Sequence, residues 1–353
     1  MQGIGLALAA AALFGAAAPA CKLLLGSFGA FTLAGLLYLG AALATFAPWW
    51  RDLRAEGQPR LDARNFELLL GAIAAGGLVA PVLMLFALRL TLAGDVALLL
   101  NLELAATALL GVALFHEPLS RAGWLGVAGA IAAGALVGAG GGWPGWLAAA
   151  LVAAACAGWG LDNQLTALQS GLTPAGITFW KGLCAGGVNL AIGLSLEPFA
   201  ARPGEIAAAL GVGALCYGAS LVLYIAAAQQ LGATRAHVGF ASAPFLGAAL
   251  SFAWLGEPLT PMNAAGAALL AASVALLLAS RHGHAHVHGA QEHVHAHRHD
   301  DGHHLHAHPG LAPGARHTHW HRHEPLAHAH AHWPDLHHRH EHGADDERRE
   351  GTP

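Results

Sequence analysis

The pentapeptide His116-Glu117-Pro118-Leu119-Ser120 returns as Gly256-Glu257-Pro258-Leu259-Thr260, 140 residues further along, and each copy separates two long apolar segments. The same offset relates residues on both sides of it: Ala87, Ala93, Ala113, Gly126 and Ala128 correspond to Ala227, Ala233, Ala253, Gly266 and Ala268. Self-similarity at a fixed offset indicates an internal repeat. The chain is therefore predicted to be a tandem duplication, and a duplicated membrane unit is typical of transporters.

The composition favours a membrane protein. Of the 353 residues 55% are hydrophobic and 11% charged, against roughly 25% charged in an ordinary soluble domain. The four cysteines lie in or beside apolar runs without CxxC spacing, so no disulfide framework is expected. A soluble helical bundle would show a polar face at every turn, which these segments lack. Ten stretches are long enough to span a bilayer: residues 3–22, 30–49, 66–88, 92–115, 122–141, 144–167, 175–196, 206–229, 233–255 and 261–280.

These stretches predict an all-α integral membrane protein of ten transmembrane helices, followed by a tail. We assign residues 1–140 to a first five-helix repeat, 141–280 to a second, and 281–353 to the tail. The first stretch lacks the basic region of a signal peptide and is expected to be a retained span. Because five is odd, the two repeats insert with opposite topology, as alternating access requires.

Arginines in the short loops set the expected orientation. With both termini in the cytoplasm, seven arginines face inward and two, Arg89 and Arg202, face outward. The inward set is Arg51, Arg54, Arg60, Arg64, Arg121, Arg235 and Arg281. We expect a multi-pass protein of the bacterial inner membrane, with the Glu117 loop inside and the Glu257 loop outside.

The chain resembles the EamA-type family of the drug/metabolite transporter superfamily over residues 1–280. The resemblance rests on the two Glu-Pro-Leu loops, on Leu99-Leu100-Asn101-Leu102-Glu103, and on residues 159–166, which open the second half much as Leu13-Phe14-Gly15 open the first. It implies ten helices in two inverted repeats and a secondary carrier of a small polar solute. One departure is Leu104, where the family often has a proline; the second repeat has Pro244 there.

Four charged residues within or at the ends of apolar spans are the first candidates for a transport site. They are Glu103, Asp162, Lys181 and Lys22. A charge inside a bilayer costs at least about 2.5 kcal/mol, so it usually faces water or another charge. Glu103 is our first candidate for proton coupling, and either lysine is a candidate for holding an anionic solute. The alternative is a static pair between a carboxylate and a lysine that only joins helices.

Amide side chains provide a second group of candidates, since they can orient a polar solute or join helices. They are Asn101, Asn163, Gln164, Asn189, Gln229 and Gln230. Four other polar residues are expected near helix ends, from where their side chains can extend to the membrane–water interface. They are Arg89, Asp95, Arg235 and His237. Glu117 and Glu257 each precede a proline and are expected to favour the N-terminus of the next helix.

Beyond Arg281 the sequence alternates histidine with small residues, and 23 of the 25 histidines lie there. Few large apolar residues accompany them, so residues 281–353 are predicted to be disordered. Spaced imidazoles bind transition metals, and the tail is expected to bind Zn, Ni, Co or Cu. The expected ligands are His282, His284, His286, His288, His293, His295, His297, His299, His303, His304, His306 and His308.

Three functions remain open at this point. The first is a carrier of a small polar metabolite or amino-acid-like solute, coupled to protons. The second is a divalent metal (Ni, Co or Zn) transporter fed or regulated by the tail, and the third is a membrane-anchored metal buffer or sensor. Without a P-loop or a large soluble domain, neither enzymatic activity nor a required cofactor is expected. The expected partners are the bilayer, a solute, metal ions at the tail and a candidate second copy of the chain, but no nucleic acid.

Overall fold

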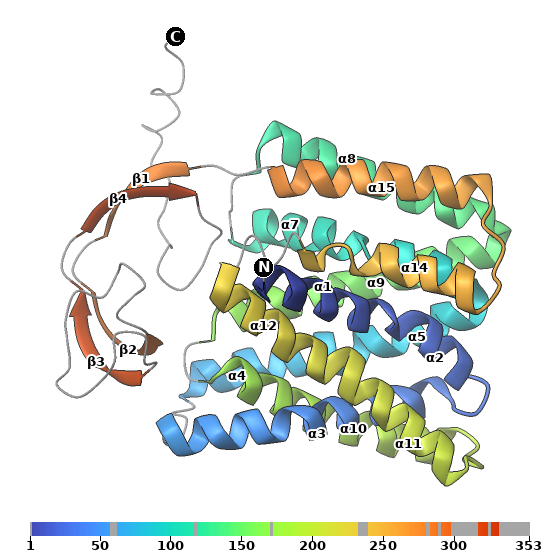
Figure 1. Cartoon of the computed structure of the whole chain (residues 1–353), viewed down its shortest axis with the longest axis horizontal. Helices are drawn as coiled ribbons and strands as arrows, with labels where there is room; N and C mark the ends of the chain where they lie inside the picture. Colours follow the sequence, from blue (N-terminus) through green and yellow to red (C-terminus); the bar gives the residue numbers. More distant parts are fainter. Residues whose placement is uncertain are drawn as a thin grey trace.

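The computed structural model describes residues 2–56, 62–115, 119–169, 172–231 and 239–279, and the backbone of four tail segments (Figure 1). Nine helical segments in this part are long and apolar enough to cross a bilayer, and α14 is a shorter apolar helix. The first half contains α1 (Gln2–Gly15), α2 (Ala17–Leu24), α3 (Ala30–Glu56), α4 (Ala63–Ala72), η1 (Ile73–Val79), α5 (Ala80–Leu90), α6 (Ala93–Leu99), α7 (Leu102–Phe115) and α8 (Arg121–Gly140). The second half contains α9 (Gly142–Ala167), α10 (Pro174–Leu196), α11 (Pro203–Val212), η2 (Gly213–Ala219), α12 (Ser220–Leu231), α14 (Ala243–Trp254) and α15 (Pro261–Ala279).

Equivalent helices of the two halves pack against each other and run in opposite directions. The helix α3 packs along α10, and α8 packs along α15 (Figure 1). Other helices also contact the opposite half: α1 lies against α12 and α14 of the second half, while α9 lies against α5 and α7 of the first. This arrangement confirms the two inverted five-helix repeats predicted from the sequence.

Glycines allow α3 and α10 to approach closely. A Cβ added to Gly186 would lie 2.8 Å from the backbone nitrogen of Leu39, and one added to Gly35 would lie 2.5 Å from that of Leu190. Apolar lipid gives helices no hydrophobic reason to associate, so close backbone packing supplies the attraction instead. This helix pair joins the two halves along the full thickness of the bundle.

Two spans contain a π-helical segment at the same place in each repeat. The segment η1 covers Ile73–Val79 and η2 covers Gly213–Ala219, again 140 residues apart. A π-helical turn spaces backbone hydrogen bonds by five residues instead of four and is found frequently at functional sites. Apolar periodicity did not predict these segments.

The fourth span is broken although Leu104 stands where the family often has a proline. After α6 ends at Leu99, Glu103 and Leu104 donate their backbone N–H to residues three positions earlier, at 3.1 and 3.3 Å. The second repeat is interrupted at the equivalent place, since α14 begins only at Ala243. The predicted ninth span covered residues 233–255; residues 232–238 lie outside the described part, and the helix starting at Ala243 is short.

Short strands are described in part of the tail. It contains β1 (Gly283–His288), β2 (Gln291–His297), β3 (His317–His323) and β4 (Leu326–Ala331), paired antiparallel as β1 with β4 and β2 with β3. The alternation of histidine with other residues in these segments has the two-residue period of a strand. The rest of the tail and all its side chains lie outside the described residues.

Packing between α3 and α10 can be tested on two adjacent glycines. We expect Gly186→Ala to lower the free energy of unfolding by about 1–3 kcal/mol, since the added methyl overpacks the interface. Gly187→Ala is the matched control, because an added Cβ there meets nothing within 4 Å. Thermal unfolding of the purified protein in detergent measures both. Equal stability of the two variants would contradict the assigned packing.

Candidate functional site

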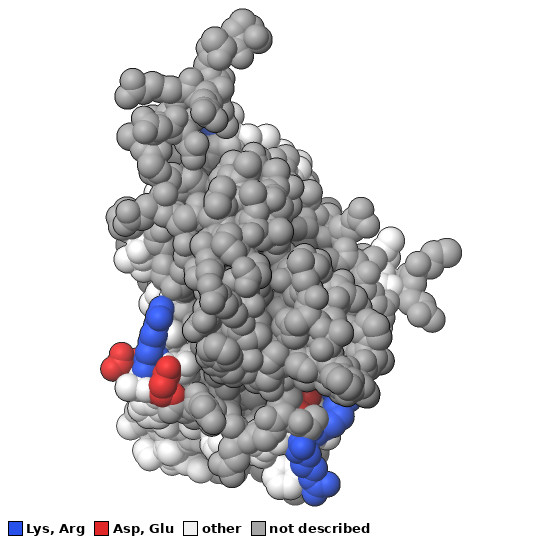
Figure 2. All heavy atoms as spheres, turned by 90° about the vertical axis from the view of Figure 1, so that its left-hand side faces the viewer, with Lys and Arg blue, Asp and Glu red and all other residues white. Residues whose placement is uncertain are grey.

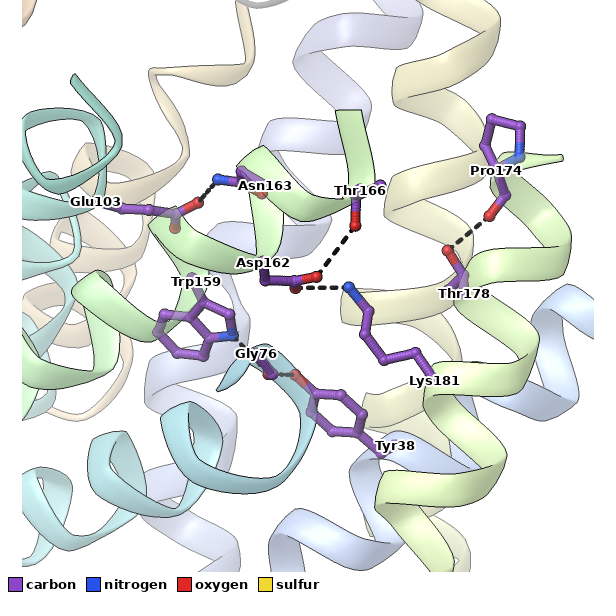
Figure 3. Close-up of polar contacts among 10 residues, drawn as sticks. All are labelled: Tyr38, Gly76, Glu103, Trp159, Asp162, Asn163, Thr166, Pro174, Thr178 and Lys181. Carbon is purple, nitrogen blue, oxygen red and sulfur yellow. Dashed lines mark hydrogen bonds and ion pairs between the residues drawn. The ribbon is translucent and has the colours of Figure 1, made fainter. Parts of the chain in front are cut away.

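An ion pair between α9 and α10 forms the centre of the candidate site (Figure 3). Lys181 Nζ lies 2.6 Å from Asp162 Oδ2, and their side chains are 19% and 6% exposed. The second carboxylate oxygen of Asp162 accepts a hydrogen bond from Thr166 Oγ1 at 3.1 Å. Lysine and aspartate offset each other's charge, which lowers the cost of placing both within an apolar span.

A second carboxylate lies beside this pair. Glu103 Oε1 accepts a hydrogen bond from Asn163 Nδ2 at 2.8 Å, and Asn163 is the residue after Asp162 on α9 (Figure 3). Glu103 is half-buried in the first turn of α7. Because the fourth span breaks before Leu102, this turn lies inside the membrane bundle, and its helix dipole favours a negative charge. The break therefore positions the second acid.

Backbone carbonyls of η1 hold the site from the other side. Gly76 O accepts hydrogen bonds from Tyr38 Oη at 2.6 Å and from Trp159 Nε1 at 3.0 Å (Figure 3). Asn189 Nδ2 donates to Gly77 O at 3.3 Å. The side chains of α3, α9 and α10 thus converge on one π-helical segment.

The glycine at position 76 is required by the approach of Asp162. An added Cβ would lie 2.1 Å from Asp162 Oδ2, closer than any real contact permits. In the equivalent segment of the other repeat, η2, the corresponding carbonyl has a donor nearby in the sequence: Cys216 O accepts a hydrogen bond from Ser220 Oγ at 2.5 Å. Ala80, at the equivalent place in the first repeat, has no hydroxyl. Donors from other helices take over this role at η1.

Of the charged and amide side chains predicted as candidates, the structure brings four together: Glu103, Asp162, Asn163 and Lys181. Three further candidates lie apart from the ion pair. Gln164 donates to Thr107 O at 3.4 Å, and Asn101 Nδ2 donates to Leu98 O at 3.0 Å within the broken span. Lys22 donates to the carbonyls of Leu88 and Thr91, the latter at 2.7 Å, and so caps the end of α5.

Sequence reasoning missed three contributors to the site: Tyr38, Gly76 and Trp159. Trp159 belonged to a motif already singled out, and Tyr38 is the single tyrosine of the first half, so a polar ring in an apolar span was an available signal. Gly76 had no such signal, since many glycines occur in these spans.

Two residues assigned to ordinary helix ends have different roles. Asp95 is buried and accepts hydrogen bonds from Thr91 Oγ1 at 2.8 Å and from Asn263 Nδ2, so it does not reach for the interface. Glu257 does not favour the helix after it: its carboxylate accepts from Ala93 N and Gly94 N, at the start of α6 in the other half.

Some predicted residues cannot be placed. The described residues do not include Glu117, Arg235 or His237, and the side chains of Gln229, Gln230 and the tail histidines are also not described. Within the described part, no group of three or more His, Cys, Asp or Glu side chains is arranged to hold a metal ion.

Comparison with known proteins finds a family match, a similar curated protein and solved structures of similar fold. Residues 1–139 and 144–279 each match the EamA-like transporter family. A protein of Methanothermobacter thermautotrophicus described as an uncharacterized transporter is 27% identical over 293 residues, covering 75% of this chain and 82% of its own. A solved crystal structure aligns with a TM-score of 0.53 and 18% identity, covering 78% of this chain and 95% of that one. At that identity it supports the fold alone.

The ion pair gives a test of the site's construction. We expect Lys181→Met and Asp162→Asn each to lower the free energy of unfolding by about 3–5 kcal/mol, because each change leaves its partner without a counter-charge. The double variant should lose less than the sum of the two, by roughly 1–3 kcal/mol. Chemical unfolding measures the three variants.

The matched control for this cycle is a pair of an exposed and a half-buried side chain. Arg51 and Asp52 lie 3.8 Å apart at the surface, where a similar cycle should give a coupling below about 1 kcal/mol. Strict additivity of the Lys181 and Asp162 changes would argue against a coupled pair.

Proposed function

The chain belongs to the EamA-like transporter family, and from that premise we propose that it moves a small polar metabolite or amino-acid-like solute by alternating access coupled to protons. A membrane transporter is the function common to the family and to the related archaeal protein. The observation that carries the finer proposal is the grouping of two carboxylates with one ammonium group between α7, α9 and α10.

The charge balance of this cluster suggests how coupling works. Asp162 is offset by Lys181, whereas Glu103 is bonded to the neutral amide of Asn163. With Glu103 ionised the four side chains carry one net negative charge, and a low-dielectric site favours its neutralisation by a proton or by a cationic group of the solute. The two compete for one carboxylate. Such competition is the basis for exchanging a solute for a proton.

The surroundings of the cluster suit a polar organic solute. Glu103 is half-buried and Asn163 is exposed; Trp159 lies near them, and the buried Tyr38 lies further away, on the other side of Gly76 (Figure 3). Apolar walls with a few placed polar groups are typical of small-molecule sites. A metal ion as solute has less support, because a metal path needs several converging donors and the described part offers no such group.

We propose an inner-membrane orientation with both termini in the cytoplasm. At one end of the bundle α1 begins, α3 ends, and α4 and α8 begin (Figure 1). That end carries Arg51, Arg54, Arg64 and Arg121, and charged side chains are visible at its rim in Figure 2. The positive-inside rule supports placing it in the cytoplasm.

Glu103→Gln tests the proton coupling. The amide keeps a hydrogen-bonding group for Asn163 but has no proton to exchange, so we expect flux in proteoliposomes to lose its response to an imposed pH gradient. Uptake of a panel of labelled amino acids, with a pH-sensitive dye inside the vesicles, measures solute and proton together. Glu67→Gln, at an exposed position on α4, is the control. A gradient response from pH 5 to 8 that is the same in both variants and the natural chain would refute the role of Glu103.

Removal of residues 282–353 tests the metal-binding tail. We expect the shortened chain to keep its solute flux and to lose the binding of Ni²⁺ or Zn²⁺ measured by titration calorimetry, since spaced imidazoles supply the ligands. Loss of solute flux would instead favour a metal-fed or metal-regulated carrier. Unchanged metal binding would overturn the assignment to the tail.

A further inference from the structure

The loop between α14 and α15 reaches across to the other half of the molecule. Glu257 Oε1 accepts a hydrogen bond from Ala93 N at 2.7 Å, and Oε2 accepts from Gly94 N at 2.8 Å. Ala93 and Gly94 begin α6, which continues through the break to α7 and Glu103. One side chain of the second repeat therefore holds the broken span that carries the candidate coupling acid.

The chemistry of this contact makes it a selective link. The first N–H groups of a helix have no partner in the helix, and a carboxylate beside them also lies at the positive end of the helix dipole. Gly94 makes the approach possible: an added Cβ would lie 2.7 Å from the ring of Phe252 and 3.3 Å from Glu257 Oε2. Both oxygens are used, so a longer, shorter or neutral side chain cannot replace the contact fully.

A second link lies next to the first. Asn263 Nδ2, in the first turn of α15, donates to Asp95 Oδ1 in α6. A pocket of about 420 Å³ opens beside it, with Asp95, Asn263 and Thr260 among its lining residues. Water in such a pocket can replace these hydrogen bonds when the two halves separate.

The same end of the bundle carries a similar contact between another pair of helices. Glu197, at the end of α10, accepts from Phe31 N at 3.0 Å and from Thr32 N at 2.9 Å, in the first turn of α3. Both carboxylates belong to the second half, and both cap a helix of the first. The loops involved lie at the end opposite the tail, on the right-hand side of Figure 1.

We propose that Glu257 is a positioning residue for transport: its carboxylate holds α6 against the second half and closes the solute path at the end opposite the tail, and the path opens there when the carboxylate releases α6. The inference rests on the proposed alternating access. It differs from a simple helix cap, which would change stability without changing which side of the protein is open.

The distance between the halves at that end provides the test. Spin labels attached through unnatural amino acids at Leu90 and Met262, both partly exposed, report on the first and second half respectively and leave the native cysteines in place. In the full chain in lipid nanodiscs we expect a dominant short distance. In Glu257→Gln, the ratio of short to long populations should fall by about tenfold, since a charge-assisted pair of hydrogen bonds is lost.

Two further variants separate gating from folding. Gly94→Ala disturbs the same contact from α6 and should shift the populations in the same direction, whereas Glu67→Gln should leave them unchanged. Glu257→Asp keeps the charge and should restore part of the short population. Thermal unfolding identifies any variant that is merely unstable.

The results distinguish the two proposals. A folded Glu257→Gln protein with the distance distribution of the natural chain overturns the role of Glu257, whatever its flux. If Glu257→Gln shifts the distance distribution but the natural chain shows no solute flux in vesicles, the role of Glu257 is supported and the proposed transport function is contradicted. A shift in both Glu257→Gln and Gly94→Ala, with flux altered in both, is the expected result.

Discussion

The carbonyl oxygen of Gly76 is the point on which the centre of the structure depends. Inside a bilayer a backbone group without a partner costs several kcal/mol, because no lipid atom can replace water as a hydrogen-bond donor. The π-helical segment η1 offers such a carbonyl, and Tyr38 and Trp159 satisfy it from two other helices. The requirement joins α3, α9 and η1, and the glycine leaves the room that Asp162 occupies.

The two halves share an architecture but divide its tasks. Both halves have a π-helical segment and an interrupted span. In both, a glycine that follows an aromatic residue, Gly15 or Gly160, lets two helices approach closely. Among the described residues, the polar cluster occurs in one of these arrangements: where Trp159 donates to η1, the corresponding Phe14 packs against Tyr217, with ring centroids 6.0 Å apart. The two repeats thus share their helix arrangement, while the charged residues of the cluster are not shared between them.

Much of the fold and part of the site followed from the sequence. Long apolar stretches and the repeated Glu-Pro-Leu loop predict ten spans in two inverted halves, because both signals are local or depend on a simple offset. Glu103, Asp162 and Lys181 were predictable because a charge in an apolar span is conspicuous. The hydrogen-bond partners of Lys22, Asp95 and Glu257 could not be predicted, since each of these residues bonds to a residue at least 66 positions away in the sequence.

By itself the sequence determined the membrane class, the duplication, the inversion and the charged residues of the candidate site. These depend on hydrophobic length and residue type, which need no knowledge of neighbours. Only the tertiary structure decided that Asp162 pairs with Lys181, that Glu103 pairs with Asn163, and that Glu257 caps a helix of the opposite half. Helix packing brings residues from distant positions into contact, and its distances depend on glycines and on broken or π-helical turns that apolar periodicity does not encode.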